Sequence, residues 1–193
     1  MKKTICALTL ISIIFASTVF ATFSDMPTFE SYKTAIEYLT KKGVINGYED
    51  NTFKPANPIT RAEFAKMIIT ALGEKCEDAT ETKFDDVEVE FWATKYINKS
   101  AELGLVNGYE DDTFRPQNNI TYSEVAAVII RAMGKENLTK TSNEVKMQNY
   151  MNVAYDLNLF DGVVTNDLVY ISPARRDNVA LMIYNMLNLE ISH

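Results

Sequence analysis

Residues 44–55 read Val-Ile-Asn-Gly-Tyr-Glu-Asp-Asn-Thr-Phe-Lys-Pro, and residues 105–116 read Leu-Val-Asn-Gly-Tyr-Glu-Asp-Asp-Thr-Phe-Arg-Pro. The two stretches lie 61 positions apart, and the same offset places residues 23–25 on 84–86 and residues 59–63 on 120–124. Repetition at a fixed period is typical of proteins built from supersecondary units that bury their apolar faces against one another. Because such proteins normally need at least three units, we expect a third copy.

A weaker third copy follows at an offset of 54, which places residues 159–162 on 105–108 and residues 176–180 on 122–126. Its loop keeps the length of the other two but little of their chemistry, since Gly162 is followed by Val163-Val164. We therefore predict a first repeat over 22–76, a second over 77–137 and a degenerate third over 138–193.

The N-terminus has the three parts of a secretory signal peptide: Lys2-Lys3, an apolar run over residues 5–20, and the small residue Ala21. We expect residues 1–21 to be removed after Ala21 and the protein to be secreted. A membrane anchor is the alternative, but the run is short for a span and lacks a basic flank on its C-terminal side. The leader holds two of the 19 basic residues, which leaves 17 against 26 acidic ones, a net charge of −9. This balance argues against a nucleic-acid partner.

Catalytic and metal-binding side chains are scarce. The only histidine is His193, and Cys76 is the one cysteine outside the leader, so zinc sites and Ser-His-Asp or Cys-His catalysis are not expected. Cys76 either links two chains or is an exposed bystander. The loop acids around Asp50 lack the spacing of an EF-hand, and Asp50 and Asp111 lie on separate loops. We predict no cofactor, no metal, no catalytic residue and no enzymatic activity.

Each unit is predicted to be a helix, a loop and a second helix. Apolar residues over 91–105 have the mixed three- and four-residue spacing of an amphipathic helix, which Gly104 would end. Capping boxes, Thr60 with Glu63 and Thr121 with Glu124, would start the second helices. In the third unit, the pair at 172–173, Ser-Pro, is expected to supply the N-cap and first helical residue.

Arg61 occupies the first turn of a helix, where the helix dipole disfavours a cation. An arginine beside unpaired backbone N–H groups is, however, suited to hold a carboxylate or phosphate. The third unit has Arg175-Arg176 at this position, and the second has Tyr122. The alternative is an intramolecular salt bridge from Arg61 to an acid such as Asp25 or Glu63. The loop phenylalanines are expected in the core, whereas the loop tyrosines fit either the core or a sugar ring.

These motifs, in order and at a fixed period, resemble S-layer homology repeats: the opening Phe-Ser/Asp-Asp, the Trp92-Ala93 pair, the Gly-Tyr-x-Asp-x-Thr-Phe-x-Pro loop, and Ile-Thr-Arg-Ala-Glu. The resemblance implies an all-α fold in which three repeats form a pseudo-threefold spindle around a central helical bundle. It also implies grooves between repeats that bind secondary cell-wall polysaccharide, commonly pyruvylated. Such repeats attach exported proteins to the cell wall or S-layer, with no membrane span after signal cleavage.

Carried over by position, the resemblance implies a set of polysaccharide-binding residues: Asp25, Gly47, Tyr48, Arg61, Glu63, Asp86, Trp92, Gly108, Tyr109, Glu124 and Arg176. The chain departs from the pattern at Tyr122, at Lys140 in place of the opening Asp, and at Ser31 and Lys146 in place of Trp. We therefore expect one or two competent grooves, with the groove of Arg61 as the first choice.

A second function is also compatible with the sequence. S-layer homology repeats usually anchor a further domain, whereas the three units account for this whole chain after the leader. The alternative is therefore a structural or assembly protein that recruits a protein partner through its third unit or Cys76.

Overall fold

The computed structural model describes residues 23–139, 147–164 and 170–191. Over these ranges the chain forms α1 (Glu30–Lys41), α2 (Arg61–Ala71), α3 (Thr94–Glu102), α4 (Tyr122–Ala132), the short 3₁₀ helix η1 (Glu136–Thr139), α5 (Met147–Asp156) and α6 (Arg176–Ile191). This described part contains isolated β-bridges but no strand, so the predicted all-α fold is confirmed. The predicted signal peptide and the departures at Lys140 and Lys146 lie outside the described residues.

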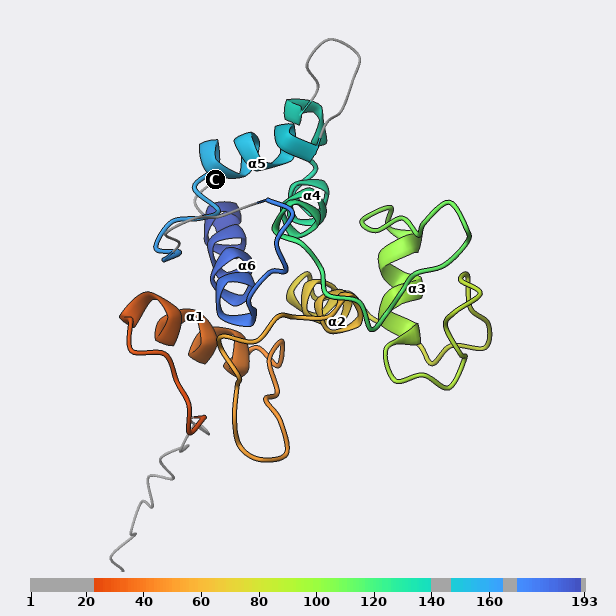
Figure 1. Cartoon of the computed structure of the whole chain (residues 1–193), viewed down its shortest axis with the longest axis horizontal. Coiled ribbons are helices and arrows are strands. Elements are labelled where there is room, and N and C mark those ends of the chain that lie inside the picture. Colours follow the sequence, from red (N-terminus) through yellow and green to blue (C-terminus); the bar gives the residue numbers. More distant parts are fainter. Residues whose placement is uncertain (1–22, 140–146, 165–169, 192–193) are drawn as a thin grey trace, which may run out of the picture.

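The second helices of the three units, α2, α4 and α6, lie in the middle of the molecule, and α1, α3 and α5 lie around them (Figure 1). Each outer helix packs on the inner helix of the preceding unit, α3 on α2 and α5 on α4. The order closes on itself, because α1 at the start of the chain packs on α6 at its end. The buried apolar residues of all units accordingly form a single core.

Three backbone hydrogen bonds join the units in a ring just before the inner helices. Ile59 N donates to Ala174 O at 3.0 Å, Ala174 N to Ile120 O at 2.8 Å, and Ile120 N to Ile59 O at 3.1 Å. Each unit thus donates one bond and accepts one. The ring establishes cyclic contact between the units, while the full spindle arrangement stays a prediction.

The ring also uses the backbone N–H groups at the start of the inner helices. Arg61 N donates to Asn118 O at 2.9 Å and Ala62 N to Pro116 O at 3.0 Å, and α4 and α6 start in the same way on the loops of the third and first units. The first N–H groups of each inner helix are therefore hydrogen-bonded to carbonyl groups of the neighbouring repeat. Our expectation that these N–H groups converge on an external anion was wrong.

The helix caps follow the sequence in two units out of three. Both capping boxes are present, and Gly104 has a φ of +67° just beyond α3. The expected start of the third inner helix at Ser172 was wrong, because α6 begins at Arg176. Ser172 O instead accepts the bond from Tyr122 N, and the following proline pairs with Thr121 in a β-bridge. The segment is held extended by the ring.

Candidate functional site

Two grooves occupy equivalent positions in the first and second units. The first, which we call the Lys66 groove, has a volume of about 130 Å³ and lies between the loop of Gly47 and the side chains of Lys66, Trp92 and Arg176. The second, which we call the Arg61 groove, has a volume of about 170 Å³ and lies beside Arg61, Asn107 and Glu124. Each groove therefore combines a loop and inner helix of one unit with the arginine of the preceding unit in the ring.

Arg176 forms the floor of the Lys66 groove. It is 7% exposed, and its guanidinium lies against the rings of Tyr48 and Phe53, with centroid distances of 5.0 and 5.2 Å. Its Nη1 donates to Glu63 Oε1 at 3.2 Å, whereas its buried Nε makes no hydrogen bond within the described structure. A buried guanidinium nitrogen without an acceptor is energetically costly, so Arg176 is less fully satisfied by the fold than an arginine with all its donors paired.

Lys66 adds a second positive charge to the same groove. Its side chain is half-buried, and no hydrogen bond or ion pair joins its ammonium group to the described residues. Burial, and then the positive charge of Arg176, lower the pKa of Lys66. An anion bound between the two cations would offset the repulsion from Arg176 and favour the charged form of Lys66.

Trp92 forms the remaining wall of the Lys66 groove. It stands just before α3, in the unit that follows, and is 49% exposed. Exposed indole rings are suited to pack on the C–H face of a sugar. The groove therefore offers two cations and an aromatic ring, the chemistry expected for an acidic sugar.

The Arg61 groove does not have the unpaired lysine and the tryptophan of the Lys66 groove. Arg61 is 5% exposed, its Nη1 donates to Glu124 Oε1 at 2.8 Å, and its Nε donates to Phe114 O at 2.8 Å. Ala127 occupies the position of Lys66, and Arg131 at its margin is held by Leu105 O, Glu136 and Tyr150. The salt bridge expected from Arg61 to Asp25 or Glu63 is instead made to Glu124 in the next repeat.

Between the second and third units, the arginine and the glutamate that pair at the other two contacts between units are both replaced. Tyr122 occupies the arginine position, and its hydroxyl accepts a hydrogen bond from Asn178 Nδ2 at 2.6 Å, where Asn178 occupies the glutamate position. Asn178 Oδ1 in turn accepts from the Tyr32 hydroxyl at 2.7 Å. The Tyr32 hydroxyl also accepts from Val164 N at 2.8 Å. This uncharged network fills the position that the guanidinium occupies elsewhere.

Asp25 and Asp86, which we predicted to be binding residues, hold the loops in shape. The Asp25 carboxylate accepts hydrogen bonds from Phe53 N at 2.6 Å and Lys54 N at 2.8 Å. Asp86 accepts from Phe114 N and Arg115 N, both at 2.7 Å. These contacts give each aspartate a structural task. Tyr48 donates its hydroxyl to Glu63 Oε1 at 2.9 Å, which fixes both residues at the edge of the Lys66 groove.

The predicted glycines are required by close packing. A Cβ atom on Gly47 would meet the ring of Phe23 at 2.1 Å, and one on Gly108 would meet the ring of Phe84 at 2.4 Å. Tyr109 lies between two guanidinium groups, 4.9 Å from Arg61 and 3.9 Å from Arg115. Tyr48 lies in the same way between Lys54, at 4.0 Å, and Arg176, at 5.0 Å, so the two loops share this arrangement.

Sequence reasoning missed Lys66. It was passed over because it lies between the apolar residues of α2, although its place three residues after the capping glutamate was visible. The joint role of Trp92 and Arg176 was also missed, since only the folded chain brings the second and third units together at the loop of the first.

Comparison with known proteins gives a family match in two segments. Residues 22–65 and 83–126 both match the S-layer homology domain, and together they contain α1, α3 and the first parts of α2 and α4. The third unit has no such match.

Three relatives share this part of the sequence. Cell surface glycoprotein 1 of Acetivibrio thermocellus is 40% identical over 121 residues, which is 58% of this chain and 5% of that protein. The cellulosome-anchoring protein of the same organism is 39% identical over 115 residues, 58% of this chain and 26% of the relative. A cell surface protein of Thermoanaerobacter kivui is 28% identical over 198 residues, 98% of this chain and 25% of the relative.

The chain thus spans about a quarter or less of the length of these relatives. The two domain matches and the similarity to surface proteins place it at the cell wall or cell surface. Within the described residues, no helix has the length and hydrophobicity needed to cross a membrane. The same residues contain no cluster of three or more side chains suited to hold a metal ion.

Proposed function

We propose that the chain attaches to the cell wall by binding an acidic, pyruvylated polysaccharide in the Lys66 groove. Two of its segments match the S-layer homology domain, which binds cell-wall polysaccharide, and this match supports the proposal. The role is non-enzymatic binding. One observation carries the proposal: Lys66, whose ammonium group has no partner in the described structure, lines the same groove as Arg176 and Trp92. A pyruvate ketal adds a carboxylate to a sugar ring, so it would meet both cations while the ring packs on the indole.

We further propose that residues 138–193 act as the third repeat of this binding module. The proposal is supported by the cyclic hydrogen bonds through Ala174 and by the contribution of Arg176 to the groove of the first unit. Without this segment the Lys66 groove would lose its buried arginine. Among the three junctions, the groove of Arg176 is favoured over the groove of Arg61 that the sequence suggested first, because Arg61 already has acceptors for both Nε and Nη1.

The chain offers a direct test, because Trp92 is its only tryptophan. Titration of the mature protein with purified wall polysaccharide should change the fluorescence of Trp92 saturably, and chemical removal of pyruvate should abolish the change. Lys66→Met should weaken binding about tenfold or more, as expected for loss of a charge-assisted hydrogen bond. Lys83→Met is the matched control, since Lys83 is exposed and lines no groove. Equal binding of both polysaccharide forms would refute the pyruvate requirement.

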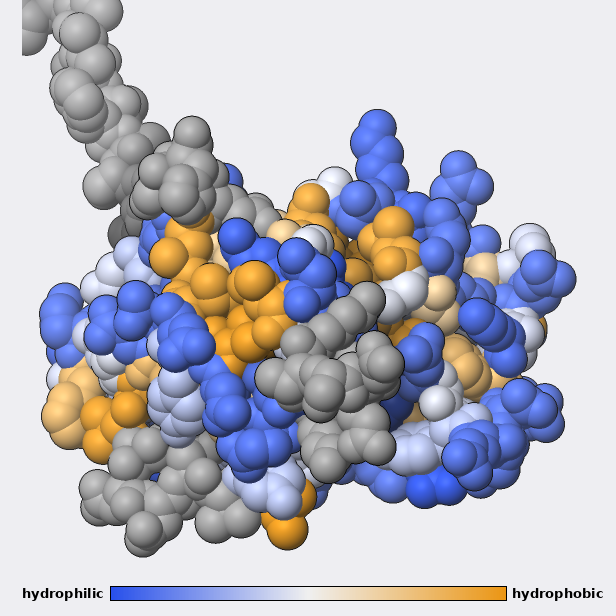
Figure 2. Space-filling model, turned by 90° about the horizontal axis from the view of Figure 1, so that it is seen from above, coloured by the Kyte–Doolittle hydropathy of each residue, from blue (hydrophilic) through white to orange (hydrophobic). Residues whose placement is uncertain are grey.

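A second candidate function is recruitment of a protein partner. Phe29 and Val164 are 57% and 49% exposed, and both adjoin Tyr32 at the junction of the first and third units. The surface seen in Figure 2 also shows apolar side chains gathered between hydrophilic ones. This function predicts that Phe29→Ser removes a complex seen by sedimentation in an exported-protein extract while leaving polysaccharide binding intact. Sedimentation as a monomer throughout would argue against it.

A further inference from the structure

A larger pocket shares one lining residue, Trp92, with the Lys66 groove. It has a volume of about 420 Å³ and is lined by the segment at 78–79, by residues 89–92 and by Lys95 of α3. Trp92 lines both the Lys66 groove and this larger pocket. This shared residue makes the larger pocket a neighbour of the Lys66 groove.

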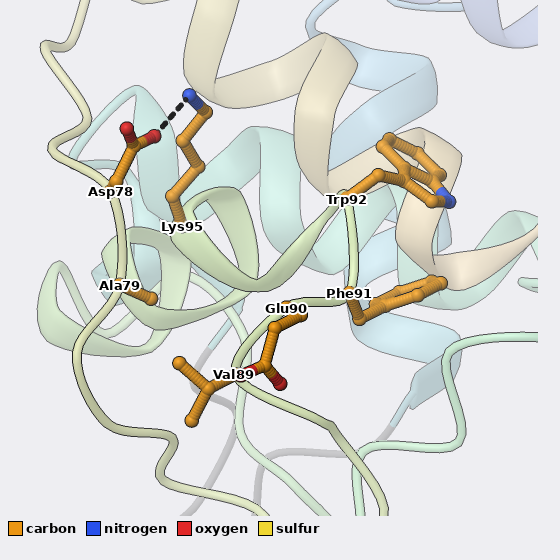
Figure 3. A pocket seen from close by; sticks show the side chains of 7 residues that line it. All are labelled: Asp78, Ala79, Val89, Glu90, Phe91, Trp92 and Lys95. Atoms are coloured by element: carbon orange, nitrogen blue, oxygen red, sulfur yellow. Dashed lines mark hydrogen bonds and ion pairs between the residues drawn. The ribbon is translucent and has the colours of Figure 1, made fainter.

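The two sides of the pocket differ in chemistry (Figure 3). The rings of Phe91 and Trp92 lie on one side, 5.5 Å apart between centroids. Asp78 and Lys95 lie on the other and form an ion pair of 2.9 Å. Glu90 is exposed between them, and its carboxylate makes no hydrogen bond or ion pair within the described structure. Aromatic rings opposite charged hydrogen-bonding groups suit a polar ring with one apolar face.

The aromatic pair and the free carboxylate occur in the second unit but not at the corresponding positions of the first. At the offset of the repeat, Phe91 and Trp92 correspond to Glu30 and Ser31, and Glu90 corresponds to Phe29. The first unit therefore lacks both the aromatic pair and the free carboxylate at these positions. Of the first and second units, only the second therefore has the residues that give this pocket its chemistry.

We infer that this pocket is a second saccharide subsite, which holds the sugar next to the acidic residue bound in the Lys66 groove. The inference rests on the proposed function and deepens it. The free carboxylate of Glu90 accepts hydrogen bonds from hydroxyl or amide groups, and the acids here disfavour a second carboxylate. The neighbouring sugar is therefore neutral or amino-substituted and carries no ketal.

The test compares ligands of different length. A pyruvylated monosaccharide and an oligosaccharide fragment of the same wall polysaccharide are titrated against the mature protein, with Trp92 fluorescence as the readout. The fragment should bind about tenfold more tightly than the monosaccharide, because it alone reaches the second pocket. Glu90→Gln should weaken the fragment about three- to tenfold and leave the monosaccharide unchanged. Glu49→Gln is the control, an exposed acid that lines neither hollow.

The outcomes separate the two proposals. If neither ligand binds, or if Lys66→Met leaves both unchanged, the proposed function itself is refuted. If both ligands bind with equal affinity and Glu90→Gln alters neither, the Lys66 groove stands and the second subsite is rejected. If Glu90→Gln weakens the binding of both ligands, the second subsite is also rejected, because the carboxylate would then act on the first sugar.

Discussion

Arg176 donates from Nη1 to Glu63 Oε1 at 3.2 Å, and this contact joins the last helix of the chain to the first inner helix. The corresponding pair, Arg61 and Glu124, is shorter at 2.8 Å and is supplemented by the bond from Arg61 Nε to Phe114 O. Two equivalent arginines therefore differ in what they leave unused. Arg61 uses both Nε and Nη1 within the fold, whereas Arg176 has a buried Nε without an acceptor.

This difference predicts opposite effects for the two arginines. Arg61→Met removes two charge-assisted hydrogen bonds and should lower the free energy of unfolding by about 2 to 4 kcal/mol, with little effect on polysaccharide affinity. Arg176→Met should destabilise less and weaken binding about tenfold or more. Chemical denaturation and fluorescence titration of both variants measure the two effects. Loss of binding in Arg61→Met alone, with the protein folded, would move the site to the Arg61 groove.

Gly47 and Gly43 give a second matched comparison. Both have positive φ values, +67° and +73°, so alanine is strained at either position. Gly43 has no atom within 4 Å of an added Cβ, whereas Gly47 has the Phe23 ring at 2.1 Å. We expect Gly43→Ala to cost about 1 kcal/mol and Gly47→Ala about 3 kcal/mol or more, because the second also displaces a core ring. Denaturant midpoints of the two variants check this, and equal midpoints would contradict the packing argument.

Asp111 predicts part of the acid sensitivity of the fold. Hydrogen bonds from the Thr113 hydroxyl, and then from Arg115, lower its pKa from 3.8 to about 2. A carboxyl whose pKa is depressed in the folded state stabilises the fold above its unfolded pKa, and this stabilisation is lost as the pH falls. The loss should therefore occur between about pH 4 and about pH 2. Thermal melts of Asp111→Asn should show a shallower decline over this range than the parent protein, and identical slopes would contradict the assignment.

The uncharged junction can be tested by removing one hydroxyl. The Tyr32 hydroxyl contacts Asn178 Oδ1 and Val164 N, so Tyr32→Phe leaves the buried Asn178 Oδ1 without this donor and also removes the acceptor of Val164 N. We expect a loss of about 1 to 3 kcal/mol in the free energy of unfolding. Tyr38→Phe serves as the control, because Tyr38 contacts the ring of Tyr184 and its hydroxyl makes no hydrogen bond in the described structure. Equal stability of the two variants would argue against the network.

Cys76 can be tested by its reactivity. The side chain is partly buried, and burial raises the pKa of its thiol. Because the thiolate is the reactive form, alkylation at pH 8 should be slower than for an unfolded chain and should speed up on denaturation. Equal rates in both states would show that the thiol is fully accessible, as a disulfide between two chains would require.

The sequence predicted the parts of the fold that repeat. The period located the helices and loops of the first two units, and the capping boxes located the start of α2 and α4, because these features depend on local residue order. The start of α6 was missed, since the residues at 172–173 are held by a bond from Tyr122, far away in the chain. A local rule cannot detect a segment whose shape is fixed by another repeat.

The candidate site was predicted less completely for a related reason. Alignment with the motif found Arg61 and Arg176 and put Arg61 first, but the difference between them lies in which acceptors the folded loops supply. Asp25 and Asp86 were found as a matched pair, yet their partners are backbone N–H groups. The neighbourhood of Lys66, Trp92 and Arg176 depends on cyclic packing.

The packing of α1 on α6 has a consequence for how the chain folds. In an open solenoid each repeat contacts only its neighbours, so folding can start anywhere and spread. Here the ends of the chain must meet, and contacts between distant residues slow folding because a long loop must close first. A ribosome that has not yet released α6 holds a chain whose first helix still exposes its apolar face. This unit can finish folding only after α6 has left the ribosome.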